Sequence, residues 1–91
     1  MAKRVDANQA QIVQQLRDFG ASVKDIHEVK GCFDILAGYR GRDYKFEIKT
    51  EAGKLTTAEI EFQNSWRGSP VYVIHDIEEA IQILIDGSED L

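Results

Sequence analysis

The segment from Asp43 to Thr50 alternates apolar and charged residues without a break, a pattern typical of a β-strand with one buried face. Its apolar positions are Tyr44, Phe46 and Ile48. Its charged positions are Lys45, Glu47 and Lys49. A strand of this kind needs neighbouring strands to pair with and a layer to cover its apolar face, so we expect a packed sheet.

A pairing partner is predicted directly upstream. Cys32 to Tyr39 has the composition of a strand, and Tyr39 to Arg42 forms a tight turn that joins the two strands as a hairpin. Apolar residues occupy both faces of this strand after Asp34, which favours a central strand covered on both sides. One face carries Phe33, Ile35, Ala37 and Tyr39, and the other carries Leu36 and Gly38.

The N-terminal segment predicts a helix followed by a strand. Asp6 is a good N-cap and forms a capping-box-like pair with Gln9. Gly20 ends the helix, and a strand is expected over residues 21–27. The apolar stripe of the helix consists of Ile12, Leu16 and Phe19, with Val13 beside it.

A second helix follows the hairpin, because Thr56 and Glu59 form a capping box. Phe62 and Trp66 continue its apolar face, which places Trp66 in the core rather than in a base-stacking position.

The remaining residues predict one more strand and one more helix. The strand runs from Pro70 to Ile74, with Tyr72 and Val73 in the core. Asp76 caps the last helix, Gly87 ends it, and Ser88 to Leu91 is expected to be frayed. The element order is therefore α-β-β-β-α-β-α, an α/β sandwich around a mixed four-stranded sheet. A length of 91 residues predicts one domain over residues 1–91.

Composition and charge bear on the cellular location of the protein and on its binding partners. No apolar run reaches the length of a membrane span, the N-terminus lacks a secretory signal, and Cys32 has no partner for an intramolecular disulfide. These features favour a reducing, cytoplasmic location. The net charge of −5 argues against nucleic acid, but it is unevenly distributed. Residues 1–54 carry ten basic and eight acidic residues, a net +2, whereas residues 55–91 carry one basic and eight acidic residues, a net −7.

Asp34, Glu47 and Lys49 are the candidate catalytic residues. Glu47 and Lys49 share one face of their strand, and the hairpin brings Asp34 opposite residues 47–49. Two carboxylates at such short range repel one another unless a cation lies between them. Mg²⁺ suits a site of two carboxylates, the backbone carbonyl of Ile48, waters and substrate phosphate oxygens. The competing interpretation is a surface ion pair between Glu47 and Lys49 with no catalytic role.

The stretch Gly31-Cys32-Phe33-Asp34-Ile35-Leu36, followed by Glu47-Ile48-Lys49, resembles the PD-(D/E)XK nuclease superfamily. The sequence is most similar to small stand-alone phage and prophage nucleases of the VRR-Nuc and Holliday-junction-resolvase-like kind. This resemblance covers nearly the whole chain. It implies a restriction-endonuclease-like core with an added C-terminal helix. It also implies DNA cleavage that depends on Mg²⁺ or Mn²⁺, with branched or phage replication and repair DNA as the substrate.

The resemblance assigns metal ligation to Asp34 and Glu47 and catalytic support to Lys49. Other stretches that carry it are Arg4 to Asn8, Gly38 to Gly41, Leu55-Thr56 and Trp66 to Gly68. Active members commonly form dimers or higher homo-oligomers, so a homodimer is expected here.

The chain departs from the family pattern at several positions. Phe33 replaces the usual proline, and Gln9 stands where many relatives carry a metal-binding glutamate. Glu59, with Gln63 one turn later, stands where the second helix often presents a glutamine. The loop over residues 50–54 is short and poor in basic residues.

Three functions remain open from the sequence. The first is a metal-dependent DNA endonuclease, the second a weakly active or inactive module of the same fold that binds DNA or a protein, and the third a plain α/β interaction protein without metal. The candidate DNA contacts are Lys45, Lys30, Arg40, Arg42 and Lys54.

Overall fold

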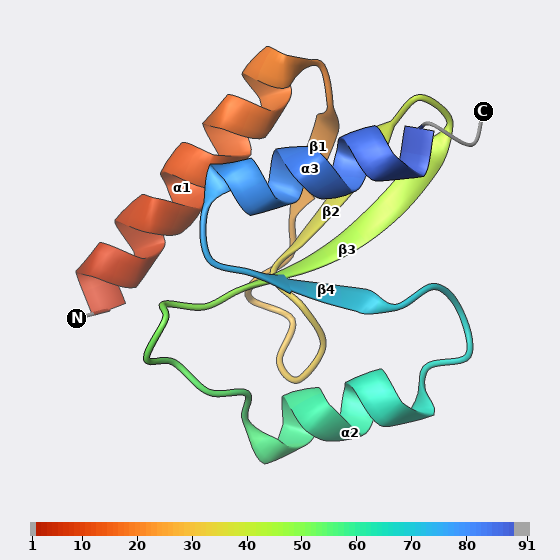
Figure 1. Ribbon diagram of the computed structural model, residues 1–91. Coiled ribbons are helices and arrows are strands. Elements are labelled where there is room, and N and C mark those ends of the chain that lie inside the picture. The colour runs from red at the N-terminus through yellow and green to blue at the C-terminus, as the bar shows by residue number, and fades with distance from the viewer. Residues whose placement is uncertain (1, 89–91) are drawn as a thin grey trace.

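The chain folds into a four-stranded mixed sheet with helices on both faces, as a computed structural model shows (Figure 1). The structure describes the backbone of residues 2–88 and the side chains of residues 8–88. The predicted element order is confirmed. The elements are α1 (Ala2–Phe19), β1 (Ser22–Asp25), β2 (Ile35–Tyr39), β3 (Arg42–Ile48), α2 (Thr57–Ser65), β4 (Val71–Ile74) and α3 (Ile77–Ser88).

The sheet has the strand order β1-β2-β3-β4, with β1, β2 and β3 antiparallel and β4 parallel to β3. The predicted β2–β3 hairpin closes through Arg40 and Gly41, whose φ angles of 52° and 84° are those of a type I′ turn. Parallel pairing of β3 and β4 requires a crossover, and α2 provides it on the face opposite α1 and α3.

The core lies between the sheet and the layer formed by α1 and α3. The apolar face predicted for β3 is buried there, and the apolar stripe of α1 packs against it. The side chains that form this core are Ile12, Val13, Leu16, Ala21, Ile35, Ala37, Tyr44, Phe46, Ile48, Ile74, Ala80 and Leu84.

The opposite face of the sheet is only partly covered, which corrects three expectations. Trp66 is 49% exposed, Val73 is 37% exposed and Leu36 on β2 is 36% exposed, so none of them is a core residue. The physical reason is the size of the cover: α2 has nine residues, none of them buried. This face of the sheet therefore carries apolar residues, but the described residues form no second hydrophobic core on it.

Several predicted boundaries shift. The helix α1 begins at Ala2, so Asp6 lies inside it and is not its N-cap; Ala2, Lys3 and Arg4 favour helix and extend it upstream. The strands β1 and β2 are shorter than the predicted 21–27 and 32–39. Gly20 ends α1 as predicted, with φ 116°.

The helix α3 continues past Gly87 to Ser88, because Gly87 serves close packing rather than helix termination. A Cβ at Gly87 would lie within 1.9 Å of the Tyr44 hydroxyl oxygen. Residues 89–91, expected to be frayed, lie outside the described residues. Within the described chain, no helix is both long enough and apolar enough to cross a membrane.

Candidate active site

The sheet register places Asp34 beside Glu47. Ile35 pairs with Phe46 in the β2–β3 ladder, and the Asp34 N–H donates to the Phe46 carbonyl at 3.0 Å. Asp34 therefore continues the ladder by one position and lies on the face of the sheet that carries Glu47, away from the core. The structure thus brings together the two carboxylates that the sequence singles out.

The Asp34 side chain is held by the backbone of the neighbouring strand. Its Oδ2 accepts a hydrogen bond from the Ile48 N–H at 2.8 Å, just past the end of the regular β2–β3 pairing. This bond uses one carboxylate oxygen and fixes the orientation of the other. Ile48 therefore contacts Asp34 through its N–H, while its side chain is buried in the core.

Glu47 is a buried carboxyl in a conflicting environment. It is 2% exposed. Its pKa is raised from the ordinary 4.5 to about 8, first by burial and then by the neighbouring charges of Asp34 and Glu59. Lys49 acts in the opposite direction but does not compensate for the other effects. In the absence of another cation, Glu47 therefore holds a proton near neutral pH.

Lys49 bridges two carboxyl groups. Its Nζ lies 3.4 Å from Glu47 Oε2 and 3.0 Å from Glu59 Oε1. Burial alone would lower the Lys49 pKa, but the hydrogen bond to Glu59 and the charge of Glu47 raise it overall. Lys49 is therefore a firmly charged ammonium, which suits a role as an electrostatic group rather than as a base.

Glu59 is held in place by the start of α2. It completes the predicted capping box with Thr56, with bonds of 2.9 Å and 3.1 Å in the two directions. Burial would raise the Glu59 pKa, but the bonds to the Thr56 backbone and to Lys49 lower it. The capping pair was predictable from the sequence. The contact with Lys49 was not, because it depends on where α2 docks.

Gln63 lies one turn after Glu59 on the same helix. Its amide nitrogen Nε2 is buried and has no hydrogen-bond partner among the described residues. A buried donor without a partner carries an energetic cost, so this atom is available to a ligand or a water.

Gln9 has a different partner from the one that the resemblance implies. Its Nε2 donates to Asp25 Oδ1 at 3.1 Å, and the same oxygen lies 2.5 Å from His27 Nδ1. Burial would raise the Asp25 pKa, but its bonds to His27 and Gln9 lower it. This cluster lies next to the site, since the Ile26 N–H donates to the Asp34 carbonyl, but the Gln9 side-chain hydrogen bond goes to Asp25 and not to Asp34 or Glu47.

The donor set fits a small divalent cation. Asp34 and Glu47 offer carboxylate oxygens at one position on the sheet, and their mutual repulsion would be relieved by an ion between them. No group of three or more His, Cys, Asp and Glu side chains within residues 8–88 is placed to hold a metal. An ion here would therefore complete its shell with backbone, water and substrate oxygens, as Mg²⁺ commonly does.

Of the candidate DNA contacts, Lys45 lies nearest to the carboxylates along β3. It sits two residues before Glu47 on the same face, while Lys30 and Lys54 lie in exposed loops. Arg40 and Arg42 lie at the far end of the hairpin, about 17 Å from Glu47 by strand length.

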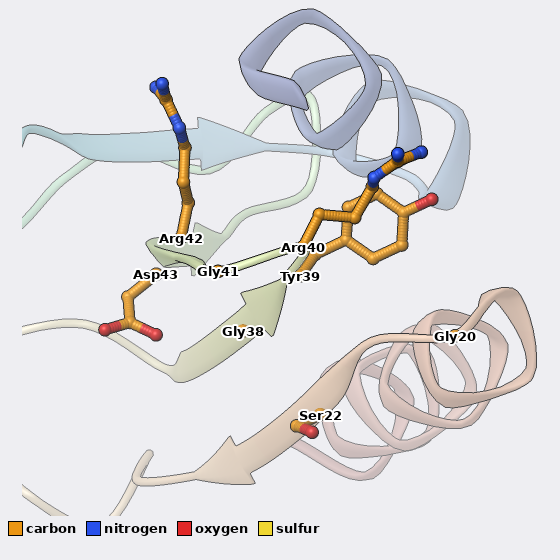
Figure 2. A pocket seen from close by; sticks show the side chains of 8 residues that line it. All are labelled: Gly20, Ser22, Gly38, Tyr39, Arg40, Gly41, Arg42 and Asp43. Atoms are coloured by element: carbon orange, nitrogen blue, oxygen red, sulfur yellow. The ribbon is translucent and has the colours of Figure 1, made fainter. Parts of the chain in front are cut away.

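A hollow of about 390 Å³ surrounds this far end of the hairpin (Figure 2). Arg40 and Arg42 extend to one side of the turn and Asp43 to the other. The two arginines therefore lie apart from the carboxylate site and would reach only a substrate that spans the whole hairpin.

Comparison with known proteins identifies the fold. No family model and no curated protein matches the chain. Among solved structures, a chain described as "VRR_NUC domain" superposes with a TM-score of 0.69, at 18% sequence identity, over 89% of this chain and 94% of that chain. This chain has the VRR_NUC fold.

VRR_NUC domains belong to the PD-(D/E)XK nuclease superfamily. The likeness confirms the restriction-endonuclease-like fold class predicted from sequence. At 18% identity the VRR_NUC likeness establishes the fold, and the chemistry depends on the residues of this chain.

Proposed function

We propose that the protein is a divalent-metal-dependent DNA endonuclease whose active site consists of Asp34, Glu47 and Lys49. The observation that carries the proposal is the adjacency of the Asp34 and Glu47 carboxyls on paired strands, with Lys49 in contact with Glu47. The similarity in fold to a VRR_NUC domain supports the same reaction class.

Each residue has a separate task. Asp34 and Glu47 hold Mg²⁺ or Mn²⁺, together with the backbone carbonyl of Ile48. The bound ion supplies a Lewis acid for the scissile phosphate and lowers the pKa of water. Lys49 places a fixed positive charge beside the phosphate and stabilises negative charge as it develops. Gln63, with its unused buried donor, is a candidate to hold a phosphate oxygen or a water.

Plasmid nicking in Mg²⁺ or Mn²⁺ tests the proposal. We expect Asp34→Asn, Glu47→Gln and Lys49→Met each to reduce the rate by about 100-fold or more, as removal of one group that stabilises a transition state does. Glu51→Gln is the matched control, because Glu51 is an exposed carboxylate just beyond β3. Nicking that persists unchanged in Glu47→Gln would show that the activity does not come from this site.

A second candidate function is a nuclease-fold module that binds DNA or a protein but cleaves poorly. Two contacts favour it: Lys49 lies closer to Glu59 than to Glu47, and Gln9 bonds to Asp25 rather than to the carboxylate pair. This alternative predicts that pure protein binds Mn²⁺ or DNA without nicking plasmid. Metal-dependent nicking that disappears in the Glu47→Gln variant would exclude it.

A further inference from the structure

The partly covered face of the sheet carries an aromatic row beside the carboxylates. Phe33, directly before Asp34, lies 5.9 Å from Phe62, measured between ring centroids. Phe62 in turn stacks on Trp66, with centroids 5.1 Å apart and an angle of 25° between the ring planes. The row therefore runs along α2 from the Asp34 end of the site, and Trp66 is its exposed end.

Trp66 is too exposed to serve only as packing. It leaves 49% of its surface accessible even though it stacks on Phe62. The neighbouring backbone is adapted to the indole, since a Cβ at Gly68 would lie 2.7 Å from its Nε1. A half-exposed aromatic ring that is fixed on two sides offers a rigid apolar surface at little entropic cost to a binding partner.

The ammonium group of Lys45 lies beside the exposed Trp66 ring. Lys45 Nζ lies over the Trp66 ring, 5.7 Å from its centroid, and donates to the Ser69 carbonyl at 3.0 Å and to the Ser69 hydroxyl. Lys45 forms no ion pair with any residue from 8 to 88, so its charge is not neutralised by a carboxylate. An aromatic ring next to an uncompensated ammonium matches a nucleotide, which presents a flat base and a phosphate together.

We propose that Trp66 and Lys45 form a nucleotide subsite, in which an unpaired base of a DNA strand stacks on Trp66 and an adjacent phosphate contacts Lys45. The inference rests on the proposed nuclease function, because it names the substrate class of that same site. Lys45 precedes Glu47 by two residues on one strand, so a strand bound at Trp66 passes the carboxylates about one nucleotide away. The preferred substrate then contains unpaired nucleotides, and a continuous blunt duplex binds poorly.

Intrinsic fluorescence tests the subsite directly, since Trp66 is the single tryptophan of the chain. In EDTA, where no cleavage occurs, a short oligothymidylate should quench Trp66 in a saturable manner. An abasic oligomer of equal length and charge should quench far less, because it offers phosphates but no bases. Equal quenching by the two oligomers, or none by either, would overturn the subsite.

Variants separate stacking from folding. Trp66→Ala should weaken binding of a labelled oligothymidylate about tenfold or more, measured by fluorescence anisotropy. Phe19→Ala is the matched control. Phe19 is a 37% exposed aromatic residue at the end of α1, where its ring contacts Tyr39. It lies on the side of the sheet away from α2, so binding should not change. Lys45→Gln should weaken binding and reduce its salt dependence, whereas unchanged binding in both Trp66→Ala and Lys45→Gln would contradict the proposal.

The two proposals fail in different ways. Metal-dependent nicking without base-dependent quenching keeps the nuclease and overturns the subsite. Base-dependent quenching without nicking keeps the subsite as a DNA-binding surface and overturns the nuclease. The Glu47→Gln variant should still show quenching, because Glu47 takes no part in stacking.

Discussion

At the scale of single residues, Glu47 is the most informative side chain. A carboxyl that is 2% exposed and faces Asp34 is costly in its ionised form, and nothing in the core requires it, because its side chain points away from the α1–α3 layer. The positive charge of Lys49 reduces this cost, but Lys49 also forms an ion pair with Glu59. Such a cost is expected where a side chain serves chemistry rather than stability.

The pH dependence of stability follows from Glu47. Between the ordinary pKa of 4.5 and about 8, the folded chain holds a proton that the unfolded chain has released, so metal-free stability falls as pH rises through this window. Glu47→Gln should flatten this dependence, and above pH 8 the variant should be the more stable protein because it removes a buried ionised carboxylate. Denaturant titrations from pH 5 to about 9 measure both effects, and comparison with the variant isolates the contribution of Glu47. An identical slope in both proteins would contradict the burial of an ionisable Glu47.

Glu59→Gln tests how the second helix influences the site. Glutamine preserves the capping box with Thr56 but removes a negative charge from beside Glu47 and Lys49. Glu47 should then ionise more readily, so Mn²⁺ should bind more tightly near pH 7, as calorimetry measures. Weaker Mn²⁺ binding in this variant would instead make Glu59 a ligand.

At the scale of elements, the β2–β3 hairpin was predictable and the docking of α2 was not. The alternation along β3 and the Arg40-Gly41 turn are local signals, and they were sufficient to place Asp34 and Glu47 on one face. The exposure of Trp66 depends on tertiary packing, which the local sequence does not determine. A helix with one apolar side can be fully buried against a sheet or only partly cover it. The polar Arg67-Gly68-Ser69 segment after it was the one local sign of a surface position.

The packing of α3 on β3 makes a separate prediction at Gly87. Alanine should favour helix there by about 1 kcal/mol, but its Cβ would clash with Tyr44, which is 5% exposed. The clash dominates, so Gly87→Ala should destabilise the protein by about 1–3 kcal/mol in denaturant titrations.

Tyr44→Phe provides the control for this prediction. The Tyr44 hydroxyl is buried without a partner among the described residues, so its removal alone should cost little. The double variant Tyr44→Phe with Gly87→Ala should recover part of the lost stability, whereas simple additivity would show that the two positions do not clash.

At the scale of the whole molecule, the sheet divides the protein into two sides, with α1 and α3 on one side and α2 on the other. The acidic excess of residues 55–91 lies on both sides, because α2 carries Glu59 and Glu61 and α3 carries Glu78, Glu79 and Asp86. A substrate of the proposed site would therefore approach the α2 side through the local charge of Lys45 rather than through the net charge of that side. The homodimer suggested by the resemblance stays a prediction, which sedimentation analysis would test.

The central claim is that Asp34 and Glu47 share one divalent ion, and anomalous diffraction from crystals soaked in Mn²⁺ tests it most directly. The account predicts a single strong anomalous peak within coordination distance of both carboxylates, near the Ile48 carbonyl, and no such peak in Asp34→Asn crystals. Empty density between the two carboxylates at saturating Mn²⁺ above pH 8, where Glu47 is ionised, would contradict it.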